Sequence, residues 1–323
     1  MKRTTIFLFL FTFSLSIQAQ TLRVTSVESG IEGLSANISD GNVTVLETNG
    51  SELVKGKYNS LTGDPSVASY VFPNGSFIVR ENIANFLLYD SFGRVQKSIS
   101  NSTQSEGGEA ISELASDQFG KTIVLYNPKV MMNGATGSRA KIINSLNVPL
   151  DVYYSQDREL SIVNVSANGE FIAFGSIKSG TEDEIQLMDR FGNILTTIEF
   201  DQPVKGVSFS ENGLFVTIFS GGRAAAYEVR SGERVGSTSF RNTSVIFAGY
   251  DPVDKIIICL TGYGSSTISD IQLHTVNVAA RKIAREDYNG SLEIKGQLKI
   301  ERTGSSRYTL TGLDKKLDLR ASF

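Results

Sequence analysis

The sequence predicts an all-β protein, a seven-bladed β-propeller made of four-stranded antiparallel blades. After residue 20, short apolar runs such as 171–174 and 215–219 alternate with clusters of Asn, Asp, Gly and Ser. The runs are rich in β-branched and aromatic residues, which is typical of short strands joined by turns. No segment after residue 20 carries the apolar spacing of a helix. A four-stranded unit that recurs roughly every 40 to 45 residues favours a propeller among the all-β folds.

The repeat is clearest in one apolar hairpin. Residues 163–175 read VNVSANGEFIAFG, residues 207–219 read VSFSENGLFVTIF, and residues 69–80 have the same form. We expect the Asn-Gly pair to supply positive φ at both central positions of a tight turn. The flanking strands are apolar at nearly every position, as expected where neighbouring blades cover both faces. The turn glycines follow one another at 45, 49 and 44 residues and are Gly75, Gly120, Gly169 and Gly213.

A second, more polar hairpin follows the first and belongs on the outer rim. It is evident at 86–99, 185–198 and 225–238. Seven blades fit the length after residue 19, at about 43 residues each. Six or eight blades are also compatible, because the third unit carries an insertion around residues 127–157. The expected blades are 21–64, 65–105, 106–156, 157–201, 202–242, 243–288 and 289–323.

The sequence leaves two modes of ring closure open. With these bounds each blade starts at an inner strand, and the two chain ends share no blade. In the other phase, the strand from Leu22 to Val27 completes the last blade. The stretches 101–108 and 132–138 are polar or Gly-rich and short enough to be loops rather than linkers. We therefore expect a single domain over residues 20–323.

Residues 1–19 have the features of a cleavable signal peptide. Lys2 and Arg3 precede an apolar segment from Ile6 to Ile17, and cleavage after Ala19 would leave Gln20 as the first residue. The apolar segment is short for a membrane anchor, and no second one follows. We expect a protein exported to the periplasm, or alternatively secreted, that does not itself span the membrane.

The scarcity of catalytic residue types argues against most enzyme classes. The chain has one cysteine, Cys259, and one histidine, His274. A single cysteine forms no internal disulfide, and one residue of each type supports neither Ser-His-Asp catalysis nor a His/Cys zinc site. We expect Cys259 to be a small buried hydrophobe and His274 to be a rim or hydrogen-bonded residue. No catalytic, cofactor-binding or metal-binding residue is predicted, and no cofactor.

The charge of the chain indicates no nucleic-acid partner. The formal net charge is −3, and removal of Lys2 and Arg3 with the signal peptide makes it −5. No basic stripe of the kind that binds nucleic acid occurs. The densest acidic cluster, residues 181–184, does not match the ligand spacing of a calcium loop and is expected to be a solvated loop.

One enzymatic alternative stays open, a carbohydrate-active glycosidase or lyase. Some propellers place paired carboxylates on the central axis, where they can cleave sugars. The chain has no tryptophan, whose flat face sugar clefts usually use for stacking. Carboxylates that converge in the axial channel within about 5 to 10 Å would favour the enzyme. A channel filled by apolar or Ser/Thr side chains would favour a binding module.

The repeating units resemble the blades of WD40-type and related bacterial β-propellers over essentially the whole chain after residue 20. No unit ends in Trp-Asp or starts with Gly-His, so the hydrogen-bonded tetrad of WD40 blades is not implied. The Ala-Gln start after a Phe-rich signal is similar to that of exported proteins of Bacteroidota. That resemblance implies an accessory subunit of an outer-membrane machine, and one specific candidate is the plug-like periplasmic subunit of a type 9 secretion translocon.

These observations predict a non-enzymatic periplasmic module that binds a protein partner in the cell envelope. Rigid blades would present their loops on two flat faces. The inserted third unit carries Met and Tyr, residue types favoured in protein interfaces. A plain solvent-facing loop with a partly buried base is the alternative for this segment. The predicted contact residues are Met131, Met132, Asn133, Tyr153 and Tyr154.

Overall fold

The computed structural model describes most of the chain after residue 20. The described ranges are 21–28, 35–39, 42–46, 51–57, 68–72, 74–143 and 148–322. They contain 29 strands, and their secondary structure is strands and turns. The described ranges hold no helix of the length and apolarity needed to cross a membrane. The predicted signal peptide, residues 1–19, lies outside the described residues.

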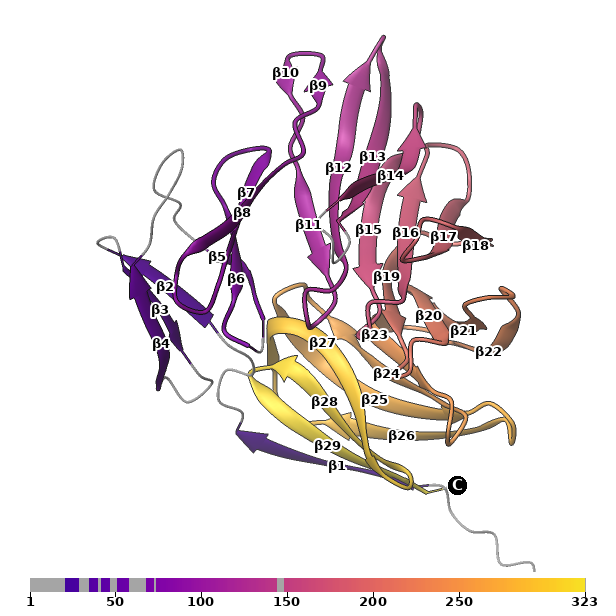
Figure 1. Ribbon diagram of the computed structural model, residues 1–323. Helices are drawn as coiled ribbons and strands as arrows, with labels where there is room; N and C mark the ends of the chain where they lie inside the picture. The colour runs from indigo at the N-terminus through magenta and orange to yellow at the C-terminus, as the bar shows by residue number, and fades with distance from the viewer. Residues whose placement is uncertain are drawn as a thin grey trace, which may run out of the picture.

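The strands form antiparallel sheets that follow one another around a common centre (Figure 1). The first sheet has three described strands, β2 (Ser35–Ser39), β3 (Asn42–Leu46) and β4 (Glu52–Lys57). Four four-stranded sheets follow, and their strands pair in chain order. They are β5 (Ala68–Val71), β6 (Phe77–Arg80), β7 (Asn85–Tyr89) and β8 (Val95–Ser100); β11 (Glu113–Ser116), β12 (Ile123–Met132), β13 (Ala135–Ile143) and β14 (Pro149–Ser155); β15 (Glu159–Val165), β16 (Phe171–Ile177), β17 (Asp183–Asp189) and β18 (Ile194–Phe200); and β19 (Val204–Phe209), β20 (Phe215–Ser220), β21 (Arg223–Glu228) and β22 (Arg234–Ser239).

An eight-stranded sheet contains the last strands of the chain and also the first. Its members are β23 (Ser244–Asp251), β24 (Ile256–Tyr263), β25 (Thr267–Asn277), β26 (Lys282–Tyr288), β27 (Leu292–Gly304), β28 (Arg307–Leu313), β29 (Lys315–Ser322) and β1 (Thr21–Glu28). A short hairpin of β9 (Gln104–Ser105) and β10 (Gly108–Glu109) lies between β8 and β11.

The sheets agree with the predicted division into four-stranded antiparallel blades. Strands β5–β8, β11–β14, β15–β18 and β19–β22 each fall within one expected blade. In the eight-stranded sheet, β25 and β27 pair over only two residues each, which divides it into two sets of four. Counted in this way, and apart from the two-stranded sheet of β9 and β10, the described residues form seven sheets of three or four strands, which is compatible with the predicted number. The blade count itself stays a prediction, because the first sheet has three described strands.

The N-terminal strand closes the ring by joining the last blade. The last blade therefore has other bounds than the ones expected first. Strand β1 runs antiparallel to β29 over its full length, from Thr21 opposite Ser322 to Glu28 opposite Lys315. Of the two modes of closure that the sequence leaves open, the structure has the one in which the strand from Leu22 to Val27 completes the last blade, so the blade bounds in which the chain ends share no blade are wrong and β1 is the outer strand of that blade. The pairing gives partners to the backbone groups of β29 that point away from β28, and β1 becomes the edge strand.

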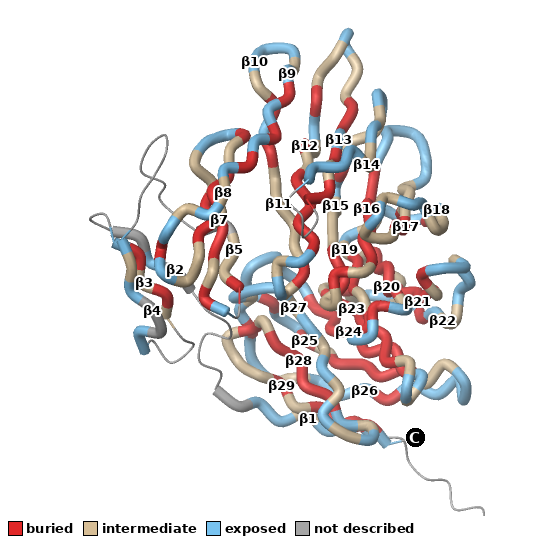
Figure 2. The backbone as a smooth tube through the Cα atoms, in the orientation of Figure 1, coloured by how far each residue is buried: buried red, intermediate tan, exposed pale blue. Residues whose placement is uncertain are grey.

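The hydrophobic core lies between successive sheets. Residues of β3 pack with residues of β6 and β7, those of β12 and β13 with β15 and β16, and those of β16 and β17 with β20 and β21. Strand β16 is buried at six of its seven positions, because neighbouring sheets cover both faces, whereas the outer strand β18 is buried at two. Figure 2 shows this gradient from buried middle strands to exposed hairpin ends.

The glycines of the inner hairpin turns adopt the left-handed conformation that the sequence predicts. Their φ angles are 81° for Gly75, 67° for Gly120, 72° for Gly169 and 74° for Gly213. The prediction that Asn and Gly both have positive φ in these turns is wrong, because Asn168 and Asn212 are not among the described residues with positive φ.

Asparagine contributes to these turns through its side chain instead. The Gly169 N–H donates to the Ser166 carbonyl oxygen at 2.8 Å. The Asn168 Oδ1 atom accepts the Glu170 N–H at 3.1 Å and so closes a longer loop. A tight turn with positive φ at both residues does occur elsewhere, at Asn133 and Gly134 between β12 and β13, where φ is 52° and 73°.

Closure of the ring by β1 makes a prediction about stability. Leu22 is 2% exposed and belongs to the core beneath the last blade. Leu22→Ala should lower the free energy of unfolding by roughly 2–4 kcal/mol, since it removes a buried side chain and leaves a cavity. Urea denaturation measures the change. The exposed neighbour Arg23 is the control, and Arg23→Ala should change the value by less than about 0.5 kcal/mol. Equal effects would show that β1 contributes nothing to the core.

The two kinds of glycine turn make a second prediction. Gly120 and Gly134 both have positive φ, so alanine strains both. A Cβ atom at Gly120 would also lie 2.8 Å from the Phe72 ring, whereas none of the surrounding atoms lies within 4 Å at Gly134. We expect Gly134→Ala to cost about 1 kcal/mol of unfolding free energy and Gly120→Ala about 2–3 kcal/mol. Thermal or urea unfolding of both variants provides the measurement, and equal losses would contradict a tight contact with Phe72.

Candidate functional site

Two hairpins of the third blade project beyond the other strands at the top of Figure 1. One contains β9 and β10, and the other is the outer part of β12 and β13. We call residues 101–112 and 128–138 the raised hairpins. The expectation that 101–108 and 132–138 are plain loops is wrong, because each range contributes to strand pairing. Strand β12 has ten residues, compared with seven in β16, so the insertion lengthens a β-ladder.

A buried asparagine fixes the base of the raised hairpins. The Asn127 side chain is completely buried, and its Oδ1 accepts hydrogen bonds from Thr103 Oγ1 at 2.9 Å and Asn101 Nδ2 at 3.2 Å. Its Nδ2 donates to the Ile111 carbonyl oxygen at 3.1 Å. Asn127 therefore ties both ends of the first raised hairpin to β12. Because the side chain is buried, loss of these bonds would leave polar groups without partners.

Backbone contacts join the two raised hairpins near their tips. The Met131 carbonyl oxygen accepts the Glu106 N–H at 2.8 Å, and the Met131 N–H donates to Ser105 Oγ at 2.8 Å. The Gly134 N–H donates to Glu106 Oε1 at 3.0 Å. Pro128 sits in a bulge of β12, where its missing N–H costs no ladder bond. The raised hairpins are thus held as one unit.

The structure places three of the five predicted contact residues in the raised hairpins and a fourth, Tyr154, beside their base. Met131 and Met132 end β12 and are half-buried, and Asn133 is exposed in the turn. Tyr154 is exposed on β14, and the Arg139 guanidinium lies 5.2 Å from the centre of its ring. Because successive residues of a strand point to opposite faces, Tyr153 faces the next blade instead.

Tyr153 belongs to the packing between the third and fourth blades. Its ring stacks on that of Phe174, with centroids 5.4 Å apart, and it lies against the core cluster of these blades. The sequence places Tyr153 and Tyr154 side by side and so does not distinguish their roles. The pairing of β13 with β14 separates them, since it sets which face of the sheet each side chain occupies.

The inner strands surround an axial cavity of about 900 Å³. Strands β11, β15, β19, β23 and β27 all contribute to its wall, together with Tyr70 at the end of β5. A bulge in β27 lets four residues, 295–298, oppose Gly312 alone, and Gln297 and Leu298 from this bulge line the cavity. The remaining wall combines Phe, Tyr, Ser, Asn and aliphatic side chains with a few charged ones.

Among the described residues, three carboxylates line the wall of the axial cavity. They are Glu211, Asp251 and Glu301. Asp251 is buried, and its Oδ2 accepts the Tyr308 hydroxyl at 3.1 Å and lies 3.5 Å from Arg302 Nε. Asp251 is thus held by a hydroxyl and a guanidinium group, whereas Glu211 and Glu301 are exposed.

Asp254, in the same turn, is the centre of an ion and hydrogen-bond cluster between the last two blades. Its Oδ2 accepts the Tyr308 hydroxyl at 2.7 Å, the Ser306 N–H at 2.9 Å and Arg302 Nε at 3.2 Å. Burial by itself raises the pKa of the Asp254 carboxyl, but these hydrogen bonds outweigh burial and hold the pKa below its usual range. Burial raises the pKa of the Tyr308 hydroxyl, and its carboxylate partners raise it further.

The single histidine and cysteine lie inside the sixth blade. His274 is buried on β25, and its Nε2 lies 3.1 Å from Thr261 Oγ1. Burial lowers the pKa of His274 to about 4, so the ring is neutral at pH 7. Cys259 is completely buried on β24, directly opposite His274, and burial raises the pKa of its thiol. Both residues are part of the packing, as the sequence predicts for a hydrogen-bonded histidine and a buried thiol.

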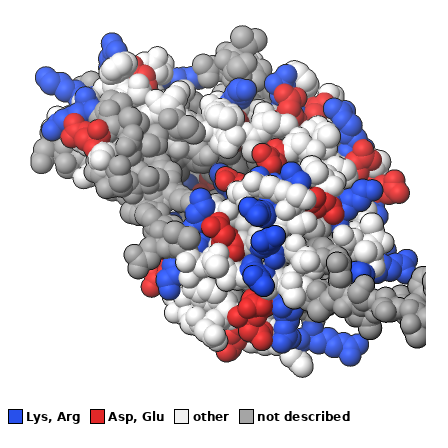
Figure 3. Space-filling view, turned by 90° about the horizontal axis from the view of Figure 1, so that it is seen from below, with Lys and Arg blue, Asp and Glu red and all other residues white. Residues whose placement is uncertain are grey.

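The acidic cluster at 181–184 is engaged with an arginine. Arg158 Nη1 lies 3.0 Å from Glu184 Oε1, and Arg158 Nη2 donates to the Glu182 carbonyl oxygen at 2.9 Å. Within the described residues, His, Cys, Asp and Glu form no group of three or more that could hold a metal ion. Figure 3 shows acidic and basic side chains interspersed over the face seen from below, so neither sign dominates that face.

Comparison with solved structures identifies the fold of the protein. The β-propeller domain of Cps50 (Swd1) from Myceliophteria thermophila superposes with a TM-score of 0.53 at 9% identity, over 94% of this chain and all of that one. The protein is a β-propeller. The Dos1 propeller gives a TM-score of 0.55 at 11% identity, over 88% of this chain and 72% of that one. A chain of the mitotic checkpoint complex gives 0.50 at 13% identity, over 99% and 100%.

The likeness of this propeller to known proteins is one of shape. The sequence matches no family model and no curated protein. The structural likeness agrees with the predicted resemblance to WD40-type blades, and at such low identity it establishes the fold alone.

Sequence reasoning missed two features of the propeller. The Asp254 cluster joins residues about 50 positions apart, and acidic and basic residues are too common for such a pairing to stand out. The second feature is a recurring Asp-x-Phe-Gly turn at 90–93, 117–120 and 189–192. A comparison of the outer and inner hairpin turns with one another would have revealed it.

The Asp254 cluster makes a prediction about stability and pH. Asp254→Asn should lower the free energy of unfolding by about 2 kcal/mol at pH 7, because an amide oxygen accepts these charged and neutral donors less strongly. Since the folded-state pKa lies below the unfolded value, the contribution is complete above the ordinary carboxyl pKa of about 4 and disappears as the pH falls through the folded value.

Urea unfolding of the wild type and of Asp254→Asn, measured from about pH 7 to about pH 2.5, tests this prediction. The two curves should converge at the acid end. Asp157→Asn is the control, because Asp157 pairs with Lys178 at an exposed site and its loss should leave the free energy of unfolding nearly unchanged. A constant difference across the whole pH range would contradict a stabilising Asp254 carboxylate.

Proposed function

We propose that this propeller is an exported, non-enzymatic interaction module that acts in the periplasm, and that its raised hairpins bind a protein partner in the cell envelope. The observation that carries the proposal is the projection itself. A ladder of strands extends beyond the ring and presents Met132 and Asn133 at its tip, and Tyr154 lies at its base, opposite Arg139.

The raised hairpins have the physical properties of a preformed contact surface. Hydrogen bonds from Asn127 and Met131 hold them, so little conformational entropy is lost when a partner binds. Tyr154 with the Arg139 guanidinium over its ring combines two residue types that often dominate interface energies. Met132 adds an adaptable apolar side chain. A plain solvent-facing loop would need neither the buried asparagine nor the paired strands.

The proposed setting rests on the sequence. The features of residues 1–19 support export, and the Ala-Gln start supports an origin in Bacteroidota. An accessory subunit of an outer-membrane or secretion assembly fits both, and the plug-like subunit of a type 9 translocon is the specific candidate. The propeller in the mitotic checkpoint complex, which is part of an assembly of proteins, supports the general role.

The proposal makes a prediction about partner binding. Met132→Ser combined with Tyr154→Ser should reduce recovery of an envelope partner by at least about tenfold, the equivalent of about 1.4 kcal/mol of binding free energy. Affinity purification of the tagged protein from native envelope fractions, followed by quantitative mass spectrometry, measures the recovery. Fractionation of the same cells shows whether the protein lies in the periplasm.

A matched variant controls for general surface changes. Leu214 and Val253 are exposed apolar residues in the turns of inner hairpins, away from the raised hairpins. Leu214→Ser combined with Val253→Ser should leave partner recovery unchanged, and thermal unfolding should show that both double variants fold. Equal recovery with both double variants, or no partner recovered with the wild type, would overturn the proposed role of the raised hairpins.

A further inference from the structure

Three turns of the propeller share the sequence Asp-x-Phe-Gly and the same geometry. In each turn the aspartate carboxylate accepts the phenylalanine N–H, at distances of 2.9 Å for Asp90, 3.2 Å for Asp117 and 2.9 Å for Asp189. The glycine N–H donates to the aspartate carbonyl oxygen, and the glycine has positive φ. Aspartate and glycine therefore both have a role within the turn.

The phenylalanine is not required by the turn. The turn of Phe119 joins β11 to β12, and in the equivalent turns of the fourth and fifth blades the same position holds Asn168 and Asn212, whose side chains accept hydrogen bonds within the turn. Phe92, Phe119 and Phe191 are 58%, 52% and 64% exposed. At Phe119 a large apolar side chain half in water occupies a position that holds asparagine in two other blades, so it contributes little to folding and is available to a ligand.

A cation accompanies each of the three rings. Arg94 lies 5.2 Å from the centre of Phe92, Lys121 lies 5.5 Å from that of Phe119, and Arg190 lies 4.9 Å from that of Phe191. The two arginines also form ion pairs, Arg94 with Asp90 and Arg190 with Glu170. Lys121 forms none with the described residues, and it is exposed. Its positive charge is therefore available to a ligand.

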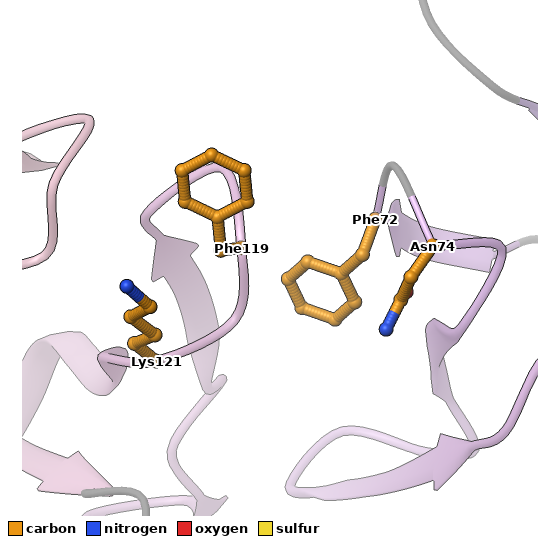
Figure 4. Close-up of a pocket in the computed structure, with 4 residues that line it drawn as sticks. All are labelled: Phe72, Asn74, Phe119 and Lys121. Carbon is orange, nitrogen blue, oxygen red and sulfur yellow. The ribbon is translucent and has the colours of Figure 1, made fainter.

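The Phe119 turn also borders a pocket, which Figure 4 shows. The pocket has a volume of about 260 Å³ and lies between two neighbouring inner hairpin turns. Phe72 and Asn74 line one side, and Phe119 and Lys121 line the other. Phe72 is buried against the backbone of Gly120, so it forms a fixed apolar wall. The volume suits one medium-sized side chain.

We propose that this pocket docks an acidic segment of a partner protein, with an apolar side chain inserted between Phe72 and Phe119. A carboxylate next to that side chain pairs with the Lys121 ammonium group. The charge of Lys121 selects an acidic segment, and the two rings select an apolar residue within it. The Asn74 side-chain amide, on the same side of the pocket as Phe72, provides a polar contact for the segment's backbone.

The pocket is a different surface from the raised hairpins. The turn that carries Phe119 precedes β12, and the turn of the second raised hairpin follows β12. Ten residues of strand separate the two turns, which corresponds to roughly 30 Å. The two surfaces therefore lie at opposite ends of the third blade, and each can fail as a binding site without the other.

A defined peptide tests the pocket directly. The probe is a fluorescein-labelled octapeptide of Glu and Asp interrupted by Leu and Phe, and fluorescence anisotropy reports its binding to the purified protein. Two comparison peptides replace the acidic residues by lysine or the apolar residues by serine. We expect the probe to bind at least about tenfold more tightly than either comparison peptide.

Variants assign the binding to the pocket. Phe119→Ser and Lys121→Glu should each weaken probe binding by about tenfold or more. Leu214→Ser, at an exposed apolar residue of another inner hairpin turn, is the matched control and should leave it unchanged. The double variant Met132→Ser and Tyr154→Ser should also bind the probe like the wild type, which separates this site from the raised hairpins.

Three results would overturn the proposal. They are absence of wild-type binding up to about 1 mM probe, equal binding of the lysine peptide, and unchanged binding by both Phe119→Ser and Lys121→Glu. Because Phe119 and Lys121 are exposed, their substitution should leave thermal unfolding unchanged. A loss of probe binding with retained unfolding temperature then reports on the pocket alone.

Discussion

The packing of apolar sheets against one another is the interaction on which the rest of this structure depends. Middle strands such as β16 and β24 are buried at nearly every position, so neither face of a blade can be left in water. Each blade must therefore lie between two others. A ring of blades satisfies this requirement, and pairing of β1 with β29 satisfies the backbone at the junction of the chain ends.

This constraint separates structural positions from those free to vary. Side chains in the middle of a blade are fixed by packing, as Tyr153 is fixed against Phe174. Hairpin ends lie outside the sandwich and can be lengthened or carry exposed residues without loss of the core. The raised hairpins and the Phe119 turn both use this freedom, at opposite ends of one blade. The scaffold thus supplies two rigid surfaces and leaves their chemistry to a few turn residues.

Polar groups in the interior support this arrangement. Asn127 ties a hairpin to its neighbour, and Asp254 ties the last two blades together through Arg302 and Tyr308. Each is buried or nearly so and satisfied by several donors, which makes it a fixed point of the fold. Arg302 and Tyr308 of this network, with Asp251, line the axial cavity.

The sequence by itself determined the all-β class, the four-stranded unit and the turn glycines, because each depends on local alternation and turn chemistry. It also indicated that Met131, Met132 and the Tyr153-Tyr154 pair belong to an inserted segment. Only the tertiary structure decided that β1 closes the last blade, that Tyr153 faces inward, and that Phe119 meets Phe72 across a pocket. Those outcomes depend on which strand edges and sheet faces come into contact in the folded chain. Residues far apart in the sequence carry no local signal of such a contact.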